Sequence, residues 1–378
     1  MRLRLLLLFT ALAPLLGGCG TLRYYSQAVR GEMQVLHRAT PIEQELRSDA
    51  VSAPLKVKLR AVLRIREFAS RELALPDNDS YKRYSDLERP YVVWNVFAAP
   101  EFSVKPVTSC FLFAGCVGYR GYFDKADAEA EGAALRKRGY DVFIGGVPAY
   151  STLGWFDDPV LSTFIQYPDS ELARLIFHEL AHQLLYVKGD TRFNESFAVT
   201  VEQVGVERWL AQNGNKRERA TYARMETMRK GFVALILKYQ AILGQYYQLD
   251  IPAEQKRLGK AQRFADMEKE YRQLKASWGG FSGYDPWLAK PNNATLASVA
   301  LYTELVPAFR ALLASEGGDL PRFYAAVKAL ARLPKEQRDA NLAAILQSSP
   351  GPSSAPRRCS LPRSRRTDRR RSQPPLPA

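Results

Sequence analysis

The sequence His178-Glu179-Leu180-Ala181-His182 places two histidines four residues apart, with a glutamate directly after the first. Residues four apart share one face of an α-helix, so both imidazoles can reach a single metal ion. Zinc accepts such nitrogen ligands, and a site with three protein ligands leaves one position open for water. Glu179 would stand beside that position and could take a proton from the water as a general base. The pattern predicts a hydrolytic zinc site on a helix.

The scarcity of histidine strengthens this interpretation. Only three histidines occur in 378 residues, and two of them form the motif. The third, His37, lies in a predicted N-terminal helix, where we expect a surface or packing role. The remaining protein ligand should therefore be a carboxylate. Glu195 and Glu202 are the two candidates, with 12 and 19 residues between each and His182.

Helices must position these side chains. Pro168-Asp169-Ser170 is a good helix start and Gly189 a good stop, so the motif lies within one predicted helix. A second helix, from about 193 to 212, carries both candidate glutamates. Beyond it we expect a helical hairpin at 217–247 and 253–277, then a helix at 293–313 and a final helix pair ending near Gln347.

The chain before the motif mixes helix and strand. Residues 20–75 read mostly as helix, whereas β-branched and aromatic runs at about 91–156 predict a small mixed sheet with a crossover helix at 125–138. We expect a further strand at 149–155. The predicted fold class is α+β and predominantly α-helical, with one domain at 19–348 whose zinc helices lie at about 170–212.

The N-terminus has the features of an export signal. Arg2 and Arg4 precede an apolar run at 5–16 that is too short to span a bilayer. Leu16-Gly17-Gly18-Cys19 resembles a bacterial lipobox, in which the cysteine is lipidated; a plain signal peptide with an incidental cysteine is the alternative. We predict a signal peptide at 1–18, a lipid anchor on Cys19 as the membrane contact, and a place at the periplasmic face of the outer membrane.

The net charge of +15 is unevenly distributed along the chain. Residues 351–378 hold eight arginines and one aspartate, so this short tail supplies +7. The rest is mildly basic and has no basic stripe with interleaved aromatics, so we expect no nucleic-acid partner. We predict that residues 349–378 form a disordered Arg/Pro-rich tail without a catalytic role.

Two cysteines remain within the predicted domain. Export to an oxidising compartment favours a Cys110–Cys116 disulfide that closes a short loop and fixes a local turn. Two buried free thiols are the alternative.

The stretch Asn194-Glu195-Ser196-Phe197-Ala198 resembles the second zinc helix of thermolysin-like and aminopeptidase N-like enzymes, together called gluzincins. In that helix the glutamate after asparagine binds zinc. The aminopeptidase branch carries a second acidic residue seven positions later, which supports a ligand histidine. The resemblance implies Glu195 as the third ligand and Glu202 behind an imidazole. The thermolysin spacing instead favours Glu202 as the ligand.

A wider resemblance covers residues 19–345. The stretches 110–123, 149–159, 178–183 and 193–198 together are similar to the bacterial putative aminopeptidase family of zinc lipoproteins. This resemblance implies one bound Zn²⁺, a peptide substrate and zinc-dependent peptide hydrolysis, with aminopeptidase action favoured. An envelope endopeptidase and a non-catalytic zinc-binding lipoprotein are the alternatives.

The gluzincin resemblance also suggests roles for three further features. Residues 149–155 would pair with an extended peptide, or would be an ordinary core strand. Asp157 and Asp158 would bind the substrate amine, or would cap a turn; the usual Gly-x-Met-Glu-Asn motif of aminopeptidases is absent. Tyr302 would donate a hydrogen bond to the substrate oxyanion, or would be a packing tyrosine.

Overall fold

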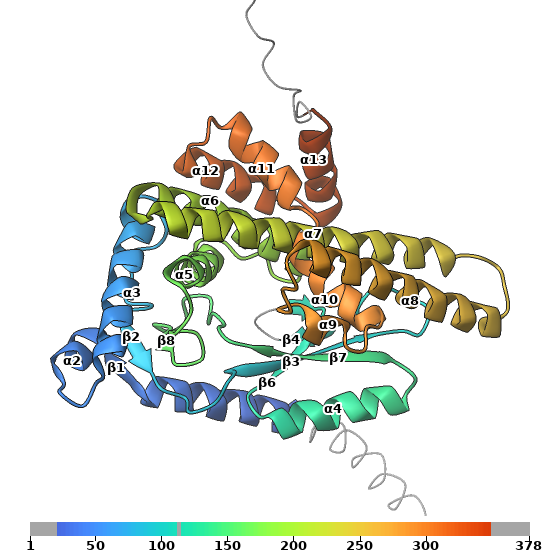
Figure 1. Cartoon of the computed structure of the whole chain (residues 1–378), viewed down its shortest axis with the longest axis horizontal. Coiled ribbons are helices and arrows are strands. Elements are labelled where there is room, and N and C mark those ends of the chain that lie inside the picture. The colour runs from blue at the N-terminus through green and yellow to red at the C-terminus, as the bar shows by residue number, and fades with distance from the viewer. Residues whose placement is uncertain (1–20, 112–114, 349–378) are drawn as a thin grey trace, which may run out of the picture.

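The computed structural model describes residues 21–111 and 115–348 of the chain (Figure 1). The predicted signal peptide, the lipidation site Cys19 and the Arg/Pro-rich tail lie outside the described residues. Within the described residues, no helix combines the length and apolar character that crossing a bilayer requires.

Two packed helices form the centre of the molecule: α5 (Asp169–Leu184) and α6 (Thr191–Asn213). Asp169 and Glu171 stand in the first turn of α5, where negative charge favours a helix start. The carboxylate of Asp190 caps α6 by accepting a hydrogen bond from the Phe193 amide. Because α6 is buried along most of its length, its side chains keep fixed positions relative to α5.

A three-stranded sheet lies beside this helix pair, with strand order β6-β3-β7 and antiparallel pairing throughout. Val96 and Ala98 face helix α4, whereas Phe97 and Ala99 face helix α10, because successive strand residues point to opposite sides. The bounds are β3 (Val93–Ala99), β6 (Arg120–Tyr122), β7 (Asp141–Val147), α4 (Lys125–Lys137) and α10 (Asn293–Thr303).

Two smaller sheets complete the strand content. One has the order β1-β2-β8 and the other is a hairpin, β4-β5. Their bounds are β1 (Ala39–Pro41), β2 (Arg83–Ser85), β8 (Val160–Leu161), β4 (Ser109–Phe111) and β5 (Gly115–Val117).

The remaining helices surround the centre (Figure 1). Residues 21–37 are helical and run along the edge opposite α7 in this view. The α7–α8 hairpin has its own apolar cluster, and the C-terminal helices pack on α6 through Phe197 and Phe309. The bounds are α2 (Ile42–Arg47), α3 (Ala53–Arg71), α7 (Lys216–Tyr246), α8 (Ala253–Ser277), α9 (Asp285–Leu288), α11 (Val306–Ser315), α12 (Leu320–Ala331) and α13 (Lys335–Ser348).

This architecture confirms the predicted fold class, a mostly helical α+β protein with small sheets. Two details differ from the prediction. Residues 149–155 form no strand; they fold into a turn around the buried carboxylate of Asp158, with positive φ at Leu153 and Gly154. The expected helix at 293–313 is divided into α10 and α11, because Pro307 near the start of α11 has no amide proton for a continuous helix.

Candidate metal centre

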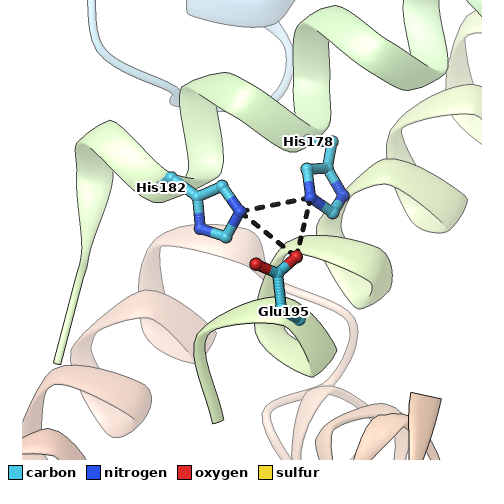
Figure 2. Close-up of side chains that lie close together, drawn as sticks. All are labelled: His178, His182 and Glu195. Atoms are coloured by element: carbon cyan, nitrogen blue, oxygen red, sulfur yellow. Dashed lines mark hydrogen bonds and ion pairs between the residues drawn. The ribbon is translucent and has the colours of Figure 1, made fainter. Parts of the chain in front are cut away.

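Three side chains from α5 and α6 converge on one point (Figure 2). The Nε2 atoms of His178 and His182 are 3.1 Å apart. Oε2 of Glu195 lies 3.3 Å from Nε2 of His178 and 3.6 Å from Nε2 of His182. All three residues are buried, and the group could hold a metal ion. The structure thus brings together the two motif histidines and the nearer of the two candidate glutamates.

Glu202 lies behind this group rather than in it. Its Oε2 accepts a hydrogen bond from Nδ1 of His178 at 2.8 Å, and its carboxylate also faces Arg174 at 3.4 Å. Because Nδ1 of His178 donates to Glu202, Nε2 is the ring nitrogen that faces Glu195. Nδ1 of His182 is buried and makes no hydrogen bond within the described residues.

Glu195 and Glu202 of α6 are held ionised. Burial raises the pKa of Glu195, but the imidazoles of His182 and His178 outweigh burial and lower this pKa to about 2. Burial likewise raises the pKa of Glu202, and Arg174 and His178 outweigh it, so the pKa lies below its usual value. An ionised carboxylate is the form that binds a cation.

Glu179 has a different environment. It is buried, and burial raises its pKa; the charges of Glu195 and Asp158 raise the pKa further, against the opposing effect of the two histidines. A carboxylate with a raised pKa is suited to accept and return a proton near neutral pH. Glu179 therefore holds a proton more readily than Glu195 and Glu202 do.

A cavity of about 1410 Å³ contains the whole constellation. His178, Glu179, His182 and Glu195 line it, and Tyr302 of α10 lines it as well. Burial raises the pKa of Tyr302 well above its usual value, and the charge of Glu195 adds to this effect. The hydroxyl of Tyr302 stays protonated and can donate a hydrogen bond into the cavity.

Tyr119 is a cavity residue that the sequence analysis did not select. It follows strand β5 and lines the same cavity as Tyr302. Its pKa is raised by burial first and then by Glu195, so its hydroxyl also stays protonated. In the sequence, Tyr119 lies three residues after Cys116 in a run of glycines and aromatics. This position is the feature that could have indicated a role at the site.

The β4–β5 hairpin that precedes Tyr119 is closed by a disulfide between Cys110 and Cys116. At the start of β5, Gly115 has φ +78° and lies against the loop that joins α5 to α6. A Cβ at this position would stand 2.6 Å from the Gly189 amide nitrogen and 2.7 Å from Cγ of Lys188. The β4–β5 hairpin thus packs closely against the loop between α5 and α6.

Asp157 and Asp158 occupy different environments. The buried carboxylate of Asp158 accepts hydrogen bonds from Ser151, the Thr152 amide and Gln183, which fixes the turn at 149–157 against α5. Asp157 is exposed. Neither residue lines the cavity within the described part of the chain.

This arrangement defines the molecule as a mostly helical α+β protein with a buried group of two HExxH histidines and a glutamate that could hold a metal ion. The family model described as "Putative aminopeptidase" matches residues 23–342, so the chain belongs to that family. No curated protein and no solved structure matches the chain.

Proposed function

We propose that this protein is a zinc-dependent peptide hydrolase that acts as an aminopeptidase, with Glu179 as its general base. The observation that carries the proposal is the buried triangle of His178, His182 and Glu195, with Glu179 in the same cavity. Family membership supports a peptide as the substrate.

The donor set fits zinc in both distance and chemistry. Nitrogen and oxygen ligands about 2.0–2.2 Å from a tetrahedral zinc ion lie roughly 3.3 Å from one another. The three separations in this group are 3.1, 3.3 and 3.6 Å. Nε2 of His178 also faces Nε2 of His182 and a carboxylate oxygen, so three potential metal-ligand atoms surround one point.

Zinc bound in this group would lower the pKa of a water to about 7 and polarise the carbonyl of the peptide. As the water oxygen bonds to the carbonyl carbon, the Glu179 carboxylate would take a proton from it and deliver that proton to the peptide nitrogen, whose bond to the same carbon breaks. Tyr302 donates a hydrogen bond to the carbonyl oxygen as negative charge develops there. Glu202 keeps the ring of His178 oriented throughout, because its carboxylate holds Nδ1–H.

Metal content and peptide hydrolysis, measured together on the purified full-length chain, test the proposal. We expect about one zinc per chain and hydrolysis that a chelator abolishes. Glu179→Gln should retain zinc and lose about 10²–10⁴-fold in kcat, since only proton transfer is removed. A natively purified protein without zinc would refute the metal assignment.

Endopeptidase action is a second candidate, and the cavity favours it in one respect. Asp157 and Asp158 do not line the cavity, so neither is placed to bind a substrate amine. Cleavage of matched peptides with free and acetylated N-termini separates the two activities. An aminopeptidase cleaves only the free form, whereas an endopeptidase cleaves both. A zinc-binding lipoprotein without catalytic activity would cleave neither.

We further propose that Cys19 anchors the protein in the outer membrane on its periplasmic face. The lipobox-like sequence before Cys19 is the support for this proposal. Cys19→Ala should move the protein from the membrane pellet to the soluble fraction after cell lysis and fractionation. Equal membrane retention of the variant and the wild type would contradict the anchor.

A further inference from the structure

Large apolar side chains gather in the cavity although they are open to solvent. Ten large apolar side chains of the described residues are exposed, and four of them line this one cavity. They are Val29, Met33, Phe156 and Trp287, with 62%, 55%, 47% and 37% of their surface exposed. Exposed apolar surface that is concentrated in one concave place marks a binding site.

These side chains lie on different elements. Val29 and Met33 are one turn apart on the helical segment 21–37, so they form a stripe along one helix face. Phe156 extends from the turn after β7, whereas Trp287 belongs to α9 beside α7. In Figure 1 the segment 21–37 lies below α5 and α7 lies above it. The histidines of α5 therefore share the cavity with apolar groups from separate walls.

Most charged side chains of the cavity walls are paired within the described part of the chain, and Lys230 is an exposed exception. The carboxylate of Glu32 accepts a hydrogen bond from the hydroxyl of Tyr150. Three arginines that line the cavity are paired with carboxylates of the chain itself: Arg174 and Arg229 with Glu171, and Arg310 with Glu207. Beside the apolar side chains of the segment 21–37, a ligand also meets Oε1 of Glu32, which is buried and makes no hydrogen bond within the described residues.

The size of the cavity sets the scale of the ligand. Pockets for drug-sized molecules span ~300–1,000 Å³. A volume of 1410 Å³ exceeds that range and suits a peptide segment of several residues. Because the metal-binding group opens into this same volume, a peptide that covers the apolar walls also passes the catalytic side chains.

We propose that the substrates are peptide segments with several large apolar side chains, and that Val29 and Met33 are specificity-determining residues. This inference rests on the proposed peptidase function and names its substrate class. Burial of the two side chains against an apolar substrate removes apolar surface from water, which stabilises the complex. A polar peptide gains nothing from the same contact.

Binding to the zinc-loaded full-length Glu179→Gln protein tests the proposal without hydrolysis. Two C-terminally labelled peptides of equal length and charge are compared by fluorescence anisotropy, one rich in Leu and Phe and the other in Ser and Gln. We expect the apolar peptide to bind at least about tenfold more tightly. Adding Val29→Ser and Met33→Ser should weaken its binding about tenfold and leave the polar peptide unaffected.

The matched control carries Val57→Ser and Leu258→Ser. These two side chains are 61% and 66% exposed and do not line the cavity. The control should bind both peptides as the parent does. Equal affinities for the two peptides, or equal effects of the two double variants, would overturn the proposal. A loss of binding to phospholipid vesicles without a change in peptide affinity would also overturn it, since the stripe would then contact a membrane.

These measurements distinguish a failure of the proposed substrate class from a failure of the proposed peptidase function. If the wild type hydrolyses no peptide while Glu179→Gln still prefers the apolar one, the peptidase function fails and the apolar site stands. If the wild type is active but the two peptides bind equally, the function stands and the substrate class is wrong.

Discussion

At the scale of single residues, the carboxylate of Glu202 determines which nitrogen of His178 faces the metal-binding group. Nδ1 donates to Glu202 at 2.8 Å, and Nε2 faces Nε2 of His182 and Oε2 of Glu195. Such partners behind a ligand histidine typically contribute 10–100-fold to metal affinity. The seven-residue offset between Glu195 and Glu202 on α6 places one carboxylate in the group and the other behind it.

Glu202→Gln should therefore weaken zinc binding about 10–100-fold, because an amide holds the Nδ1–H less strongly than a carboxylate does. Competition with a chromophoric chelator measures this affinity. The control is Glu207→Gln, which makes the same change at an exposed residue further along α6. It should leave zinc affinity unchanged. Circular dichroism of both variants establishes that α6 is intact. Unaltered zinc affinity in folded Glu202→Gln would contradict the orienting role.

Tyr119 and Tyr302, two of the tyrosines that line the cavity, belong to different parts of the fold. Tyr302→Phe should lower kcat about 10²–10³-fold with little change in KM, because the lost hydrogen bond forms only as the oxyanion develops. Tyr119→Phe is the paired variant, since its hydroxyl lines the same cavity. Steady-state kinetics on one peptide measures both. A large loss in Tyr119→Phe with an unchanged Tyr302→Phe would assign the donor to the hairpin instead of α10.

At the scale of elements, the α5–α6 connection and the β4–β5 hairpin depend on each other. Gly115 approaches Gly189 so closely that a side chain cannot be accommodated. The disulfide of Cys110 and Cys116 keeps the hairpin closed behind that contact. Tyr119 follows directly, so the hairpin sets where this tyrosine enters the cavity.

Gly115→Ala tests this contact, and Gly139→Ala is its control. Both glycines have positive φ, +78° and +85°, but a Cβ on Gly139 meets nothing within 4 Å. Gly139→Ala should cost only the backbone strain of roughly 1–2 kcal/mol. Gly115→Ala should cost more in the free energy of unfolding and should also reduce peptide hydrolysis. Equal destabilisation of the two variants in urea unfolding would show that the hairpin moves freely.

At the scale of the whole molecule, one buried ion pair joins the central helices to the C-terminal helices. The carboxylate of Asp190, the cap of α6, accepts a hydrogen bond from Arg338 of α13 at 2.6 Å, and both side chains are buried. Burial raises the pKa of Asp190, but Arg338 and Lys335 outweigh it and lower the pKa below its usual value. The start of α6 is thus fixed by a residue that is distant in sequence.

Asp190→Asn should lower the free energy of unfolding by roughly 3–5 kcal/mol at neutral pH, because Arg338 is left buried without its counter-charge. The folded-state pKa of Asp190 is depressed, so its stabilisation is present above the unfolded pKa of about 3.9 and is lost as pH falls through the folded value. Urea unfolding between neutral and acidic pH measures the difference between the variant and the wild type.

That difference should shrink below a pH of about 4. The control is Asp339→Asn, whose partly exposed pairs with Arg192 and Lys335 should contribute about 1 kcal/mol or less. A difference between Asp190→Asn and the wild type that is independent of pH would contradict the role of the ion pair.

Local sequence alone determined the motif helix, its histidines and the mostly helical fold class. A spacing of four residues fixes a shared helix face whatever surrounds it, so His178 and His182 could be paired without a structure. Asp169 at the start of α5 and the long runs of helix formers beyond it are equally local signals.

Only the tertiary structure decided which carboxylate faces the Nε2 atoms of both histidines. Glu195 and Glu202 lie on one face of one helix, and the packing of α6 on α5 selects between them. The same holds for residues 149–155, whose strand-like composition gives way to a turn because Asp158 is buried there. Tyr119 and Val29 reach the cavity from distant elements, and no local pattern encodes such a meeting, because it depends on long-range packing.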